Sequence, residues 1–184
     1  MGFHTFDADK AALLDDVSRF RYCSRDELVG HLACDPTATV ADLGSGTGFY
    51  TDEVAPFVGT VYAVDVQAEM HDWHRGNGVP ANVDLVTSDV ASLPFDDGHL
   101  DAAFSTMTFH EFASPEALTE LRRVLADGGR VVTVDWSANG TGDAGPHMDE
   151  RFSAAETGAQ FEAAGFDVPV TQERPDTLLV VAVA

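Results

Sequence analysis

Short apolar runs rich in β-branched residues recur along the chain and are separated by stretches long enough for a helix. Such runs occupy residues 38–43, 60–65, 83–87, 100–105 and 130–135. Alternation of this kind is typical of parallel strands covered by helices on both faces. Residues 166–184 add two more apolar runs, joined by a turn at Pro175 and Asp176. The pattern therefore predicts an α/β fold with a doubly wound sheet of seven strands.

Capping residues and helix breakers divide the segments between and before these strands. Residues 7–34 predict two helices ahead of the first strand. A further helix is expected to start after Ser114 and to stop at residues 126–130, where two glycines follow one another. Ser153 and Glu156 have capping-box spacing and predict the start of the last helix.

The 184 residues, 45% of them apolar, suit one domain with a substantial core. We expect a single domain over residues 1–184, in which helices within 1–35 pack near the ligand site and 36–184 form the core. The N-terminus lacks a signal-peptide pattern and no apolar run is long enough to span a bilayer, so we expect a cytoplasmic protein. Cys23 and Cys34 are interpreted as idle thiols of a reducing compartment.

The charge balance is extreme, because 31 acidic residues face 10 basic ones and the formal net charge is −21. Binding to nucleic acid or to an anionic membrane depends on Lys and Arg, so we expect neither as a partner. The acids are spread over the chain beside a normal apolar content, which argues against disorder. The balance resembles that of proteins from extreme halophiles, and we interpret the chain as halophilic.

High salt is therefore expected to stabilise this protein. At about 1 M salt the screening length falls to roughly 3 Å, which removes most of the repulsion among the acidic side chains. We expect the melting temperature to rise between dilute buffer and molar KCl in a thermal unfolding experiment. An unchanged melting temperature would contradict the halophilic interpretation.

A glycine-rich turn follows the first predicted strand in the run VADLGSGTGFYT, residues 40–51. Gly44, Gly46 and Gly48 stand at every second position, where bare backbone and a following helix N-terminus favour close approach of a ligand. A dinucleotide site has the spacing G-x-G-x-x-G, whereas Phe49 occupies the place of the third glycine here. The spacing therefore disfavours an NAD(P)-dependent oxidoreductase.

Acidic side chains stand where the second and third predicted strands end. Ligands of open α/β sheets bind outside the carboxyl ends of the strands. Asp65 is placed to accept hydrogen bonds from both hydroxyls of a ribose, and Asp89 from an exocyclic amine such as that of adenine. The glycine turn has no lysine for phosphates, so the pattern indicates a nucleoside whose tail is not a polyphosphate.

Histidines give the other candidates for chemistry. His110, beside Glu111 after the fourth strand, is either a general base or a residue that structures the loop by hydrogen bonds. His71 and His74 share one face of a predicted helix, and we interpret them as an exposed surface pair. No third ligand accompanies them in the pattern, so we expect no metal site.

Residues 38–135 resemble the class I S-adenosylmethionine-dependent methyltransferases. VADLGSGTGFYT is similar to their motif I, AVD closes the second strand, SDVASLPFDDGHLDAAFS matches the third and fourth, and ELRRVLADGGRVVTVDW matches the next helix and strand. The match is best with the methyltransferase type 11 group, which includes ubiquinone and menaquinone biosynthesis enzymes. The resemblance implies a Rossmann-like sheet, mostly parallel with the last strand antiparallel. It also implies S-adenosyl-L-methionine as cofactor and a small-molecule methyl acceptor.

The resemblance assigns roles to individual residues. His110 is the candidate catalytic base. The glycines line the methionine part of the cofactor, Asp65 holds its ribose, Asp89 with Val90 borders its adenine, and Asp42 positions the glycine turn or the amino group of the cofactor. The full set of implied cofactor-binding residues is Asp42, Gly44, Ser45, Gly46, Gly48, Asp65, Val66, Asp89, Val90 and Ser105.

Several alternatives stay open. The chain is either an enzyme or a protein that binds S-adenosylmethionine or S-adenosylhomocysteine without turnover, and it is either a monomer or a homodimer. The methyl-accepting atom is carbon, oxygen, nitrogen or sulfur. Aromatic residues expected to stabilise the sulfonium charge are Phe49, Tyr50, Phe109 and Trp136. Phe3, His4 and Phe6 either fold over the cofactor as a lid or belong to a frayed terminus.

Overall fold

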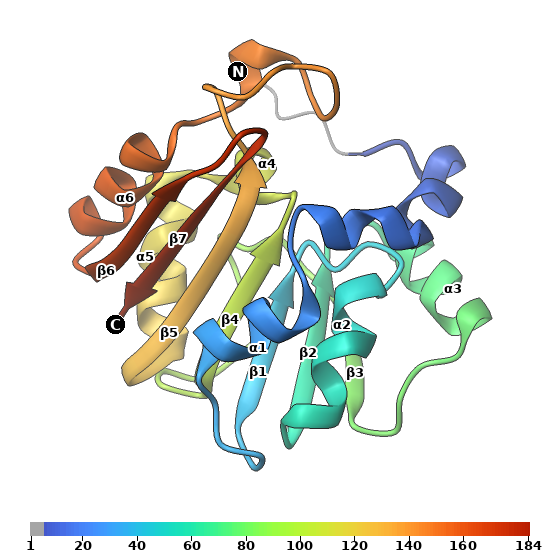
Figure 1. The fold of residues 1–184 in the computed structure, drawn as a ribbon. Coiled ribbons are helices and arrows are strands. Elements are labelled where there is room, and N and C mark those ends of the chain that lie inside the picture. Colours follow the sequence, from blue (N-terminus) through green and yellow to red (C-terminus); the bar gives the residue numbers. More distant parts are fainter. Residues whose placement is uncertain (1–5) are drawn as a thin grey trace.

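A seven-stranded sheet forms the centre of the computed structural model, which describes residues 6–184 (Figure 1). The strand order is β3-β2-β1-β4-β5-β7-β6. Strands β1 to β5 run parallel to one another, and β7 is antiparallel to both β5 and β6. This confirms the predicted sheet. The strands are β1 (Thr39–Leu43), β2 (Thr60–Asp65), β3 (Val83–Thr87), β4 (Leu100–Thr106), β5 (Leu125–Trp136), β6 (Asp167–Glu173) and β7 (Thr177–Val183).

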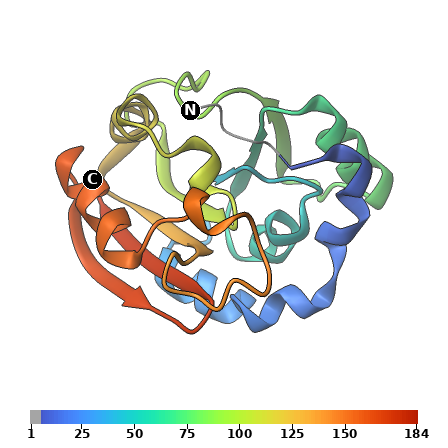
Figure 2. The same cartoon turned by 90° about the horizontal axis from the view of Figure 1, so that it is seen from above.

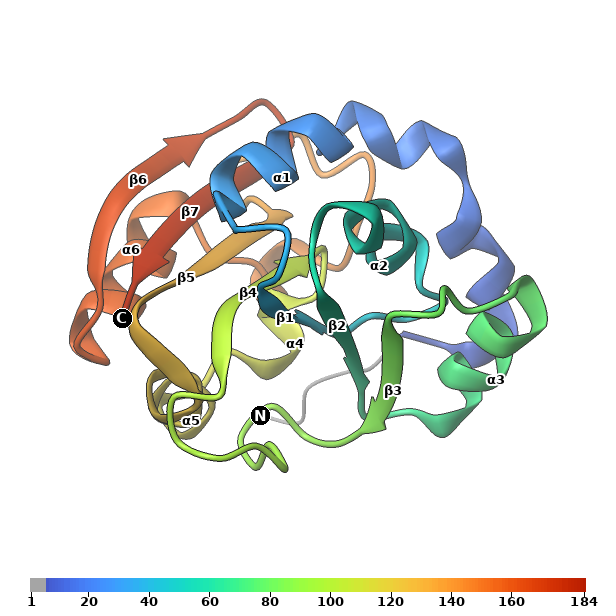
Figure 3. The same ribbon diagram turned by 90° about the horizontal axis from the view of Figure 1, so that it is seen from below.

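Helices cover both faces of this sheet, with α1 and α2 on one side and α5 and α6 on the other (Figures 1 and 3). The α-helices are α1 (Arg25–Leu32), α2 (Phe49–Val54), α3 (Ala68–Asn77), α4 (Phe109–Phe112), α5 (Pro115–Val124) and α6 (Ala154–Ala163). Four 3-10 helices accompany them: η1 (Ala8–Asp15), η2 (Val17–Arg21), η3 (Ala55–Phe57) and η4 (Met148–Glu150).

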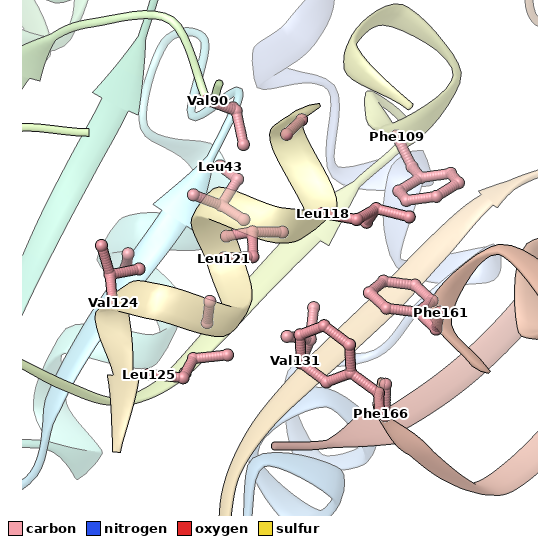
Figure 4. Close-up of a cluster of buried hydrophobic side chains, with 14 of the residues drawn as sticks. Leu43, Val90, Phe109, Leu118, Leu121, Val124, Leu125, Val131, Phe161 and Phe166 are labelled. Carbon is pink, nitrogen blue, oxygen red and sulfur yellow. The ribbon is translucent and has the colours of Figure 1, made fainter. Parts of the chain in front are cut away.

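The two faces of the sheet bury two separate apolar clusters. Because successive side chains of a strand point to opposite faces, Val40 of β1 packs with α1 and α2, whereas Ala41 packs with α5 and α6. Figure 4 shows the second cluster, in which Leu118 and Leu121 of α5 lie near Phe161 of α6. The near-continuous apolar runs of the sequence are therefore strands buried on both sides.

The N-terminal region differs from the two helices expected over residues 7–34. Only α1 is an α-helix there, and the segment before it consists of η1 and η2. This segment has no apolar stripe to bury, since Leu13 and Val17 are 65% and 72% exposed. Short 3-10 turns instead carry the chain along the rim of the sheet.

Strand β5 begins at Leu125, directly after α5, and not after the expected stop at residues 126–130. The glycines of that stretch are paired with the end of the chain. The N–H of Gly128 donates to the carbonyl of Ala184 at 2.9 Å, and the N–H of Ala184 donates to the carbonyl of Gly129 at 2.8 Å. Gly128 and Gly129 belong to β5 because of these hydrogen bonds to Ala184.

Across residues 6–184, none of the helices combines the length and the apolar character that a membrane-crossing segment needs.

Candidate functional site

A cavity of about 690 Å³ lies at the carboxyl ends of the parallel strands. It spans the point between β1 and β4 where the strand order reverses, which is where open α/β sheets bind ligands. The view along this end shows segment 8–21 (blue) and loop 137–150 (orange) around the strand ends (Figure 2). Of the predicted site residues, the cavity is lined by Gly44, Ser45, Gly46, Asp65, Val66, Asp89, Val90 and His110.

The glycine turn is fastened to the end of β2 by its backbone. The N–H groups of Gly44 and Ser45 both donate to the carbonyl of Val64, at 2.8 and 2.9 Å. A Cβ added to Gly44 would lie 2.2 Å from Cγ2 of Thr108, and the φ of this residue is +74°. Glycine is therefore required here, and the turn presents bare backbone to the cavity.

Asp65 is the last residue of β2, and its carboxylate connects that strand to the glycine turn. One carboxylate oxygen accepts from the N–H of Gly46 at 2.8 Å, and the other accepts from the N–H of Gln67 at 2.9 Å. Burial raises the pKa of Asp65, and these backbone hydrogen bonds counteract the rise. Each oxygen can accept further hydrogen bonds from a ligand in the cavity.

Asp89 and Val90 form the wall of the cavity beyond β3. The carboxylate of Asp89 accepts from the N–H of Ala91 at 2.8 Å and is exposed. Val90 is buried and packs into the cluster under α5. This wall therefore combines an apolar contact with one carboxylate at its rim.

Three predicted cofactor-binding residues do not line the cavity. Asp42 is buried under the turn and accepts from the hydroxyl of Thr51 at 2.6 Å. Gly48 is the N-cap residue before α2, and Ser105 is fully buried within β4. These residues lie at or near the ends of β1 and β4 and at the start of α2, next to the glycine turn.

Asp42 makes the fold sensitive to pH. Burial raises its pKa to about 7, so the folded protein favours the protonated carboxyl and the free energy of unfolding falls as pH rises from about 4 to about 7. We expect Asp42→Asn, which keeps an oxygen for Thr51, to be more stable than the wild type at pH 8 by on the order of a few kcal/mol. At pH 5 the two should be similar. Denaturant unfolding at both pH values measures this, and equal stability at pH 8 would contradict it.

His71 and His74 were expected on the surface, and this prediction is wrong. Their relative exposures are 1% and 0%. Nε2 of His74 lies 2.8 Å from a carboxylate oxygen of Asp52, and its ring packs against Gly48. The i,i+3 spacing correctly places both rings on one face of α3, but that face is turned toward the sheet and the glycine turn.

His110 is held by a buried carboxylate that the sequence did not single out. Asp135, at the end of β5, accepts from the backbone N–H of His110 at 2.7 Å and lies 2.9 Å from its Nδ1. Because a carboxylate only accepts, Nδ1 carries a hydrogen, and Nε2 of the neutral ring has a lone pair. The same carboxylate also accepts from the N–H of Trp136. The hydrogen bonds that fix His110 in its loop therefore also leave its Nε2 able to accept a proton, so the two roles expected for this residue are compatible.

Burial and neighbouring charges shift the pKa of His110 and that of the adjacent Glu111. Burial works to lower the pKa of His110, but the charge and hydrogen bond of Asp135, with the charges of Glu111 and Glu150, outweigh it and raise the pKa. Burial also raises the pKa of Glu111, to about 7. Nε2 of His110 lies 3.9 Å from Oε1 of Glu111. Two titratable groups thus lie close together at the β4 side of the cavity.

Further lining residues come from parts of the chain without a motif. Arg19 of η2 lines the cavity and lies over the rings of Phe49 and Tyr50, at 5.2 and 5.1 Å. It is the only lysine or arginine among the described residues that line this cavity. Burial lowers the pKa of its guanidinium. Met107 lines the cavity with a φ of +63°, an uncommon conformation for a residue other than glycine.

Only some of the aromatic and lid residues expected near the ligand line the cavity. Tyr50, Trp136 and Phe6 line the cavity, whereas Phe49 and Phe109 pack beside it or in the core. The amide of Gln67 donates to the carbonyl of Phe6 at 3.0 Å, so the N-terminal segment reaches the β2 side of the site. Phe3 and His4 lie outside the described residues.

This fold and cavity define a Rossmann-like α/β protein with a nucleoside-type pocket at the switch point of its sheet. Residues 41–133 match the family described as "Methyltransferase domain". The chain belongs to this family of methyltransferase domains, whose cofactor is S-adenosyl-L-methionine.

A solved structure and two curated proteins show how far the similarity extends. The crystal structure of "a SAM dependent methyltransferase from Aquifex aeolicus" is 32% identical with a TM-score of 0.88, and the match covers 97% of this chain and 99% of that one. The "Ubiquinone/menaquinone biosynthesis C-methyltransferase UbiE" of Ectopseudomonas mendocina is 33% identical over 57% of this chain. The "Biotin biosynthesis bifunctional protein BioHC" of Cellvibrio japonicus is 34% identical over 65% of it. The matches cover only 44% and 24% of these two curated relatives.

Proposed function

We propose that residues 1–184 form one methyltransferase domain that transfers the methyl group of S-adenosylmethionine to a small-molecule acceptor. One observation carries the proposal: the carboxylate of Asp65 and the bare backbone of residues 44–46 face the same cavity, with His110 on the far side of the switch point. The names of two curated relatives refer to the biosynthesis of biotin, ubiquinone and menaquinone, and this supports a small molecule as the acceptor.

The residues of the cavity fit the cofactor in an extended arrangement along the strand ends. The strand order places Asp89 and Val90 first, Asp65 next and the glycine turn after it. They would hold adenine, ribose and the methionine part respectively. When bound, the cofactor supplies an electrophilic methyl carbon whose leaving group is neutral, so the protein mainly has to align the acceptor and exclude water.

Arg19 is placed to bind the carboxylate of the methionine part. A charge-assisted hydrogen bond contributes about 1.5–3 kcal/mol, so we expect Arg19→Met to weaken S-adenosylmethionine binding by roughly 10-fold to 100-fold. Methionine keeps an apolar chain against Tyr50. Binding of 5′-methylthioadenosine, which has no carboxylate, should change by less than about 3-fold. Calorimetry with both ligands measures the difference, and equal losses would contradict this role.

The proposed function is tested by titrating the folded protein with S-adenosylmethionine in molar KCl, with NADH in a parallel titration. Micromolar binding of the first ligand alone is expected. Binding of NADH alone would favour an oxidoreductase, and binding of neither ligand to a folded sample would overturn the proposal. Release of S-adenosylhomocysteine in a screen of acceptors then separates an enzyme from a protein that only binds the cofactor.

A further inference from the structure

The part of the cavity beyond the glycine turn has a distinct chemistry. Its wall includes His110 and Glu111 of α4, Trp136 at the end of β5, Tyr22 after η2 and Glu150 of η4. The rings of Tyr22 and Trp136 meet edge to face with centroids 4.7 Å apart. This wall of the cavity therefore contains two carboxyl groups, one imidazole and an aromatic surface.

When the ring of His110 is neutral and Glu111 is ionised, two hydrogen-bond acceptors lie next to each other in this wall. Nε2 of His110 and Oε1 of Glu111 are 3.9 Å apart, which is too far for a direct hydrogen bond and close enough for one small group to bridge them. A bridging group needs two N–H or O–H donors on a single atom. A primary or secondary ammonium and a primary amide have them, whereas a hydroxyl has one donor and a carboxylate has none, so the charges around the site decide between the first two.

The surrounding charges favour a cation. Glu111 and Glu150 carry carboxyl groups at this wall, and the charge of Asp65 also acts on Glu111. The guanidinium of Arg19 lies over the rings of Phe49 and Tyr50, and among the described residues no ion pair joins it to Glu111 or Glu150. The guanidinium of Arg151 lies over the ring of Trp136, 5.7 Å from its centroid, and donates to loop carbonyls such as that of Pro146 at 2.7 Å. An anionic acceptor would therefore meet carboxylates, while a cation gains both charge attraction and an aromatic face.

We propose that the methyl acceptor is a small molecule with a primary or secondary amine, bound as its ammonium between Nε2 of His110 and Oε1 of Glu111. This proposal rests on the methyltransferase function proposed above. Asp135 is the positioning residue, because its hydrogen bonds keep the hydrogen on Nδ1 and leave Nε2 to act as the base.

The proposed reaction balances in both protons and electrons. Nε2 removes one proton from R–NH3⁺ and leaves a neutral amine with a lone pair. The amine nitrogen forms a bond to the methyl carbon as the carbon–sulfur bond breaks, with the electron pair of that bond left on sulfur. The product is a methylated ammonium, and the proton on His110 passes to solvent. Raised pKa values at His110 and Glu111 suit an exchange of protons near neutral pH.

The test uses ring resonances of His110 by NMR, read without turnover in protein saturated with S-adenosylhomocysteine. The probes are an amine, an alcohol and a carboxylate on each of three skeletons: propyl, cyclohexylmethyl and phenylethyl. We expect the amine of at least one skeleton to shift the ring resonances and to bind at least 10-fold more tightly than its alcohol and carboxylate. Tighter or equal binding of the alcohol or carboxylate, or no shift with any probe, would overturn the proposal.

Variants separate this proposal from the proposed function. Glu111→Gln should weaken amine binding by at least 10-fold while S-adenosylhomocysteine still binds, and unchanged amine affinity would overturn the role of Glu111. Asp135→Asn should lower the pKa of His110 in an NMR pH titration, because the neighbouring groups that remain, Glu111 and Glu150, act less strongly. An unchanged pKa would remove the positioning role. Failure of the wild type to bind S-adenosylhomocysteine would instead defeat the methyltransferase proposal itself.

Discussion

Asp65→Asn is expected to weaken S-adenosylmethionine binding by about 100-fold or more. In the wild type, both oxygens of Asp65 accept backbone hydrogen bonds, from Gly46 and from Gln67, and the carboxylate faces the cavity. Asparagine replaces one of these oxygens with an NH2 group, which cannot accept from a backbone N–H or from a ribose hydroxyl. Two weakened charge-assisted hydrogen bonds account for a loss of this size.

The matched control for this prediction is Asp84→Asn. Asp84 is exposed on the neighbouring strand β3, and the substitution makes the same change in net charge. Its affinity for the cofactor should stay within about 3-fold of the wild type. Calorimetry on both variants in molar KCl measures the contrast. Similar affinities of Asp65→Asn and Asp84→Asn would rule out Asp65 as the ribose ligand.

The sequence predicts this side of the site well because the carboxyl ends of parallel strands converge on one edge. Once the strands were located, the residues that end them had to lie together, and the cavity indeed contains Asp65, Asp89 and His110. The same rule applies to Asp135 at the end of the fifth strand. The sequence signal is weak there, because a single acid stands between Val134 and Trp136 and no cluster of polar residues marks the strand end.

Other parts of the site depend on packing that no local pattern records. Arg19 reaches the cavity because segment 8–21 crosses the rim of the sheet, where Asp15 accepts from the hydroxyl of Thr47 at 2.5 Å. The spacing of His71 and His74 shows which face of α3 they share, but it does not show what covers that face. Long-range contacts decide both cases, and a single sequence does not contain them.

Gly48→Ala is expected to be strongly destabilising, although it adds only one methyl group to the glycine turn. Gly48 has a φ of +88°, and a Cβ there would lie 2.3 Å from ring atoms of His74. That ring is fully buried and tied to Asp52, so it has little freedom to withdraw. Backbone strain of about 1–2 kcal/mol and overpacking of about 1–3 kcal/mol should together lower the free energy of unfolding by about 2–5 kcal/mol. Cofactor affinity should fall with it, because the turn and α2 must shift.

Gly165→Ala separates the clash from the strain, since Gly165 has a φ of +89° and no heavy atom lies within 4 Å of the added Cβ. Only the cost of about 1–2 kcal/mol for the left-handed backbone is expected there, with cofactor binding unchanged. In a His74→Ala background the cost of Gly48→Ala should fall to that of Gly165→Ala, because the ring that opposes the methyl group is gone. Denaturant unfolding of the four variants measures the coupling. If Gly48→Ala costs the same with and without the His74 ring, that ring is not what requires glycine at this position.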